Sequence, residues 1–135
     1  MLLLGLFGCG KPRVEEVTYT DYSNRYLNAL TIVVNTGRPY QGKTGILGGY
    51  ERCRYLFSMT IKSNTYTAND MEVRVSPTDQ DFRPKSGLVK ITQKDVQSIV
   101  IDVSIDDARI PKLVNGTYAL RSAEATPDHV WYKTK

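Results

Sequence analysis

Histidine and cysteine are both scarce in this chain of 135 residues, which has one histidine and two cysteines. Their spacing fits no zinc site, and His129 lies too far along the chain from Cys53 to suggest a Cys/His catalytic pair. The sequence has no Gly-x-Ser-x-Gly elbow for a serine nucleophile, and its clustered aspartates lack the glycine and the terminal glutamate of a calcium loop. We therefore expect no enzyme, no bound metal and no cofactor.

Long runs of basic residues and long runs of apolar residues are missing too. No stretch of Lys and Arg exceeds two residues and no aromatic RNA-binding signature is present, which argues against a nucleic-acid partner. The apolar run 2–7 is far shorter than the roughly 20 residues needed to span a bilayer. With 41% hydrophobic and 24% charged residues, the composition is that of one soluble globular domain.

The charge that is present is unevenly distributed. The chain has 18 basic and 14 acidic residues, a net charge of +4. Residues 1–65 carry all of this excess, while residues 66–135 are balanced. A basic first half favours an acidic partner or an anionic surface.

The N-terminal segment Leu6-Phe7-Gly8-Cys9 resembles a bacterial lipobox, in which small and apolar residues precede the cysteine that receives lipid. Gly10-Lys11-Pro12-Arg13 then follows as a polar tether. We expect residues 1–8 to be the remnant of a longer signal segment and Cys9 to be the lipid attachment site.

This interpretation divides the chain and places it in the cell. Residues 9–13 are the expected lipid-bearing tether, and residues 14–135 the expected single domain. Enterobacterial lipoproteins kept in the inner membrane have Asp after the lipidated cysteine. Because Gly10 stands there in this chain, we expect anchoring in the outer membrane, on the periplasmic face.

The rest of the chain reads as β-structure. Apolar and polar residues alternate with a period of two, as in Cys53, Tyr55, Phe57, Met59 and Ile61, and no long helical period is present. This pattern predicts an all-β antiparallel sandwich of about seven to eight short strands. The expected strands are Val14–Thr20, Tyr26–Asn35, Glu51–Lys62, Met71–Ser76, Leu88–Thr92, Gln97–Asp106, Tyr118–Arg121 and Val130–Lys133.

Two connections follow from glycine and proline. Asn115-Gly116 is the strongest short turn signal in the chain and predicts a hairpin turn. The stretch from Thr36 to Gly49 predicts a long Gly/Pro-rich loop. Gly37–Thr44 within it matches the P-loop pattern, but three of the five residues after Thr44 are glycines, which oppose the helix that a P-loop needs. We expect no bound nucleotide.

The long loop is instead a candidate binding element. Long loops often bind partners, and Tyr and Arg are the residue types most enriched at interface hot spots. The alternative is an ordinary solvated strand edge. The candidate partner-binding residues are Arg38, Tyr40 and Lys43 in the loop, and Tyr50, Arg52 and Arg54 on the outward face of the following strand.

Three segments carry a resemblance to a known family. They are Tyr19–Leu27, with the apolar strand and Asn35-Thr36-Gly37 after it; the glycine-rich stretch that ends at Cys53; and Val73-Arg74-Val75. Across residues 9–76 the chain is similar to short proteobacterial outer-membrane lipoproteins that include immunity proteins of type VI secretion phospholipase effectors. The resemblance implies a periplasmic inhibitor that binds an incoming lipase toxin and blocks it.

Two other functions stay open at this point. The chain is also compatible with a structural lipoprotein subunit of an envelope or secretion machine. A superinfection-exclusion lipoprotein of a phage is the second alternative. All three act by binding, which a small anchored β-domain suits.

Overall fold

The computed structural model describes residues 13–23, 28–40, 49–76, 78, 80–95, 97–122 and 129–134. Within them the chain forms ten strands in one continuous hydrogen-bonded order, β4-β7-β8-β9-β10-β1-β2-β3-β5-β6, and neighbouring strands run antiparallel. The strands are β1 (Arg13–Asp21), β2 (Ala29–Tyr40), β3 (Gly49–Thr60), β4 (Thr65–Thr67), β5 (Met71–Ser76), β6 (Gln80–Phe82), β7 (Ser86–Lys94), β8 (Ser98–Asp106), β9 (Gly116–Ser122) and β10 (His129–Thr134).

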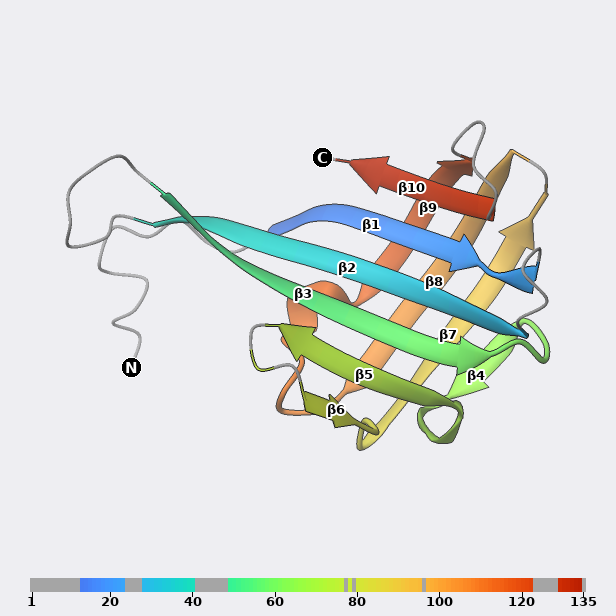
Figure 1. Ribbon diagram of the computed structural model, residues 1–135, viewed down its shortest axis with the longest axis horizontal. Coiled ribbons are helices and arrows are strands. Elements are labelled where there is room, and N and C mark those ends of the chain that lie inside the picture. Colours follow the sequence, from blue (N-terminus) through green and yellow to red (C-terminus); the bar gives the residue numbers. More distant parts are fainter. Residues whose placement is uncertain are drawn as a thin grey trace.

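The strands are arranged in two layers (Figure 1). One layer has five strands, β1, β2, β3, β5 and β6, and the other has four, β4, β7, β8 and β9. β10 joins the layers, because it pairs with β1 along its whole length and with β9 at Trp131 and Tyr132. The predicted antiparallel β-sandwich is therefore confirmed.

The core lies between the layers and is built from the alternating residues of each strand. On β8, Ile99, Ile101, Val103 and Ile105 are buried, as the period of two predicts. The corresponding buried residues of the facing layer are Leu30, Ile32 and Val34 on β2, and Tyr55, Phe57 and Met59 on β3. Cys53 packs against this core from a half-buried position, which agrees with its expected place on the inward face of its strand.

In the described part of the chain, no helix has the length and apolar character that a membrane span requires.

The sequence missed two strands. β4 and β6 are three residues each, and they form the two ends of the hydrogen-bonded order. A segment of three residues is too short to show a period of two. The described chain therefore has ten strands where seven or eight were expected.

Two predicted connections were wrong. β2 does not end at Asn35 but continues to Tyr40, and β3 begins at Gly49, so only residues 41–48 lie between these strands. Asn115-Gly116 is no hairpin turn, because Gly116 is already the first residue of β9 and pairs with Val103.

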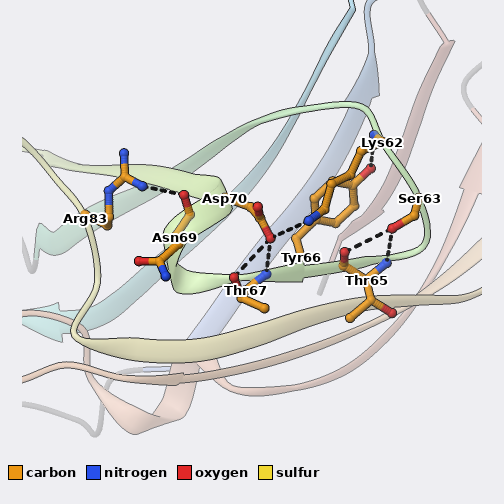
Figure 2. A network of polar contacts seen from close by, with 8 residues as sticks. All are labelled: Lys62, Ser63, Thr65, Tyr66, Thr67, Asn69, Asp70 and Arg83. Atoms are coloured by element: carbon orange, nitrogen blue, oxygen red, sulfur yellow. Dashed lines mark hydrogen bonds and ion pairs between the residues drawn. The ribbon is translucent and has the colours of Figure 1, made fainter.

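The corner at which β3 passes through β4 into β5 is held by side-chain hydrogen bonds (Figure 2). A short 3-10 helix, η2 (Ala68–Asp70), ends there. The Asp70 carboxylate accepts a bond of 2.7 Å from the Thr67 backbone N–H and pairs with Lys62 Nζ at 2.9 Å. These donors lower the pKa of Asp70 to about 2. The Tyr66 hydroxyl accepts from the Lys62 backbone N–H at 3.2 Å.

Candidate partner-binding surface

The ends of β2 and β3 extend beyond their neighbours (Figure 1). β1 begins at Arg13, opposite Gly37 of β2, and β5 ends at Ser76, opposite Arg54 of β3. Further out, positions 38–40 pair with 49–51, and among the described residues no third strand joins them. We call this the β2–β3 hairpin end, residues 36–54.

The hairpin end carries five of the six candidate binding residues on its strands. Arg38 and Tyr40 belong to β2, so they lie on paired backbone and not in the loop in which they were predicted. Tyr50 and Arg52 belong to β3, the strand on which they were predicted. Arg54 follows on β3. The sixth candidate, Lys43, lies outside the described residues, as does the lipid candidate Cys9.

Strand register places each candidate opposite a defined residue of the hairpin. Arg38 pairs with Glu51, Tyr40 with Gly49 and Tyr50 with Pro39. Arg52 stands opposite Gly37 and Arg54 opposite Asn35, and both of these arginines are exposed.

Arg52 is connected to β1 across the strand between them. Its Nε donates to the Glu15 carboxylate at 3.4 Å, and Gly37 stands opposite Arg52 on β2. A Cβ atom at Gly37 would lie 2.6 Å from Glu15 Oε1. The glycine thus leaves the space through which Glu15 reaches Arg52.

A hollow of about 340 Å³ adjoins the hairpin end on the outer face of β1, β2 and β3. Thr18, Thr20 and Thr31 are among the residues that line it, and the half-buried Val33 and Leu56 contribute apolar surface. The hollow exists because β1 pairs with β2 so that Thr18 stands opposite Val33.

The charged side chains around the hollow differ in their partners. Glu15 pairs with Arg52, and Glu16 accepts a hydrogen bond of 3.1 Å from Asn35 Nδ2, which satisfies the carboxylate without neutralising it. Arg54 lines the hollow and is exposed. In the part of the chain that the structure describes, no carboxylate or other group pairs with it.

Sequence analysis found Arg52 and Arg54 but missed the contribution of β1. The signal was present, since Thr18 and Thr20 alternate with the core residues Val17 and Tyr19. The sequence does not show that β1 pairs with β2, and this pairing brings the two threonines beside Arg54.

Two further hollows contain an ion-paired carboxylate. One, of about 550 Å³, lies at the corner of Figure 2, where Lys62 pairs with Asp70 and Arg83 donates to the Asn69 carbonyl. The other, of about 400 Å³, lies beside Asp107, whose carboxylate is held by Arg109. Glu72 also lines the first hollow, and Lys85, Asp106 and Lys112 line the second, so each carries charges of both signs.

The structure also tests the Cys/His pair as a catalytic site. His129 of β10 pairs with Asp21 of β1, and across β2 this row of paired residues reaches Met59 of β3. Cys53 lies six positions before Met59 on β3. At roughly 3.4 Å per residue Cys53 and His129 are separated by about 20 Å, too far for a catalytic pair.

The P-loop match fails on geometry. In a P-loop the chain leaves its strand at the first glycine and enters a helix. Here the strand continues through Gly37 to Tyr40 and pairs antiparallel with β3. Among the described residues, no group of three or more His, Cys, Asp or Glu side chains could hold a metal ion.

Comparisons with known proteins complete this description. No family model matches the chain, and no curated protein or solved structure is similar to it.

Proposed function

We propose that this protein is a lipid-anchored binding domain of the bacterial periplasm that neutralises a protein partner by covering it. The observation that carries the proposal is the β2–β3 hairpin end, which extends beyond the sheet and holds four basic residues against one acid. Its net charge of +3 accounts for most of the +4 of the whole chain. Such a projecting basic element suits the capture of an acidic protein surface.

Besides a charged surface, a protein that blocks its partner needs only a large enough interface and a rigid scaffold. A stable interface needs about 800 Å² on each partner and a few well-placed anchors, for which Tyr and Arg are the preferred types. The hairpin end supplies both types in sequence, and the paired layers behind it supply a rigid support. Long-range attraction by its positive charge would raise the association rate.

The identity of the partner comes from the sequence. The lipobox-like Leu6–Cys9 segment supports a periplasmic location on the outer membrane, and the family resemblance over residues 9–76 supports a type VI secreted phospholipase as the target. The proposed activity is therefore that of an immunity protein, which protects the cell that makes it from such a toxin.

The test uses the full chain and the effector encoded beside its gene. Binding is measured by calorimetry and inhibition by release of fatty acid from phospholipid vesicles. We expect a one-to-one complex that suppresses lipase activity, and weaker binding after Arg38→Glu or Arg52→Glu. Arg121→Glu on β9, in the other layer, is the matched control and should leave binding unchanged.

The same experiment separates the alternatives. No binding to the effector would contradict the immunity function. Co-purification of several envelope or secretion subunits in its place would favour a structural lipoprotein. Binding to an outer-membrane receptor, with protection against phage infection, would favour superinfection exclusion.

A further inference from the structure

The hollow on the outer face of β1, β2 and β3 has the properties of a binding site for one kind of protein segment. We propose that it receives an acidic segment of the partner protein, with one carboxylate paired to Arg54 and an adjacent apolar side chain against Val33 and Leu56. This inference rests on the proposed function in one respect only, namely that the partner is a protein.

The acidic character of the occupant follows from the charges at the hollow. Of the two carboxylates that β1 brings to this face, Glu15 pairs with Arg52, and Glu16 accepts a hydrogen bond from Asn35, a neutral amide that leaves its charge in place. Arg54 is the charged side chain at the hollow for which the described part of the chain supplies no hydrogen-bond or ion-pair partner. A guanidinium forms its strongest hydrogen bonds with a carboxylate, often in a paired geometry.

The surroundings of Arg54 would strengthen such a pair. Val33 and Leu56 are half-buried, and Thr18 and Thr31 line the hollow with them. An apolar side chain placed over these groups excludes water from the ion pair, which is the arrangement that makes an interface residue a hot spot. The hairpin end to which Arg54 belongs has a net charge of +3 that includes Arg54, and this charge repels a basic segment and attracts an acidic one.

The other two hollows hold their basic residues together with carboxylates. Lys62 and Arg83 line the corner hollow of Figure 2, where Lys62 pairs with Asp70, Arg83 donates to the Asn69 carbonyl, and Glu72 also lines the hollow. Lys85 and Lys112 line the hollow beside Asp107, which Asp106 lines as well. Of the two arginines that line the three hollows, Arg54 is the one without a hydrogen-bond or ion-pair partner in the described part of the chain, and Val33 and Leu56 supply apolar surface beside it.

The test is an NMR titration of the full chain with a short probe peptide of alternating Glu and Leu. A peptide with Gln in place of Glu is the matched probe. We expect shifts of the amide signals to concentrate at the hollow and the Gln peptide to bind much more weakly. The amides expected to respond are those of Thr18, Thr31, Val33, Asn35, Arg54 and Leu56.

Two charge reversals make the result specific. Arg54→Glu should weaken binding of the acidic peptide roughly tenfold or more, as expected for a hot-spot arginine, whereas Arg121→Glu on β9 should change it less than about twofold. Unchanged amide spectra elsewhere show that both variants are folded. Equal losses in the two variants, or shifts spread over all basic residues, would overturn the inference.

The effector of the proposed function provides an independent outcome. If the effector binds with unchanged affinity to the Arg54→Glu variant, the immunity function stands and the role of the hollow is refuted. If the effector does not bind at all while the acidic peptide maps to the hollow, the immunity function is refuted and the hollow is still a binding site for an acidic segment.

Discussion

Asp21 of β1 and Lys94 of β7 join the two layers of the sandwich, although they are 73 positions apart in the sequence. The distance between Asp21 Oδ2 and Lys94 Nζ is 3.1 Å, and the Asp21 side chain is only 10% exposed. The same ammonium lies 5.7 Å from the centre of the Tyr19 ring. The pair closes the end of the sandwich opposite to the β2–β3 hairpin end.

This pair predicts an acid-dependent loss of stability. Burial alone would raise the pKa of Asp21, but hydrogen bonds from Ser23 and Lys94 outweigh it and lower the pKa below its usual 3.8. A carboxyl group whose pKa falls on folding stabilises the protein above its unfolded pKa, and that contribution is lost as the pH falls through the folded value.

Asp21→Asn should therefore lower the free energy of unfolding near neutral pH by about 1 kcal/mol, a value that allows for the partial exposure of Lys94. Urea unfolding should show that the difference from wild type shrinks below about pH 4. Lys94→Met and the double variant complete the cycle, and additive effects would contradict the interaction.

Asp107 should contribute more, because its side chain is 3% exposed and accepts four bonds. Arg109 donates through Nε and Nη2, both at 2.8 Å, and the backbone N–H groups of Lys85 and Arg109 donate at 2.8 and 2.9 Å. Chiefly because of Arg109, the pKa of Asp107 lies well below its usual value of 3.8. Its contribution should be complete above that pH and decrease in acid.

We expect Asp107→Asn to lower the free energy of unfolding by about 2 kcal/mol near neutral pH, since an amide cannot accept all of these bonds. The neighbouring Asp106 is exposed, so Asp106→Asn is the control and should cost less than about 0.5 kcal/mol. Equal effects of the two variants in urea unfolding would show that Asp107 is not an anchor.

Gly87 should tolerate no side chain. Its φ is +155°, and an added Cβ would lie 2.9 Å from both the Cα of Ile105 and the carbonyl oxygen of Ser104. Gly116 has a similar φ of +157°, but there a Cβ would meet only the Tyr118 ring, at 3.8 Å. The two positions thus share backbone strain and differ in steric overlap.

Gly116→Ala should cost about 1–2 kcal/mol from backbone strain, and Gly87→Ala roughly 1–3 kcal/mol more from overlap with β8. Thermal unfolding of both variants under the same conditions measures the difference. A Gly87→Ala protein as stable as Gly116→Ala would mean that β7 and β8 shift apart without cost.

Tyr66 combines a fully buried ring with a single hydroxyl bond to the Lys62 backbone N–H. Tyr66→Phe removes only the hydroxyl and should cost about 1 kcal/mol. Tyr66→Ala also removes the ring and should cost about 3–5 kcal/mol. Urea midpoints measure both, and a Phe variant as stable as wild type would show that water replaces the hydroxyl.

The success of sequence analysis followed the length of each alternating segment. Met71–Ser76 was predicted with its bounds intact, and the inward set on Ser98–Asp106 was identified in full, because alternation over six or more residues is a local property. Thr65–Thr67 and Gln80–Phe82 were missed because three residues carry no period. They are strands only because a neighbouring strand lies beside each of them.

The candidate site shows the same division. The outward position of Arg52 and Arg54 was predicted from their strand. Gly37, Pro39 and Gly49 were interpreted as loop residues because glycine and proline oppose isolated strands. The structure pairs all three within the hairpin, which compensates for their weak local preference.

The sequence by itself determined that this protein is an antiparallel β-sandwich with a basic first half, because a period of two and a charge balance need no knowledge of neighbours. Only the tertiary structure decided which strands meet. It placed Thr18 of β1 opposite Val33 of β2 and Arg54 beside them, and it joined Asp21 to Lys94. Such contacts depend on the pairing of segments distant in the chain, and no local pattern of residues encodes that pairing.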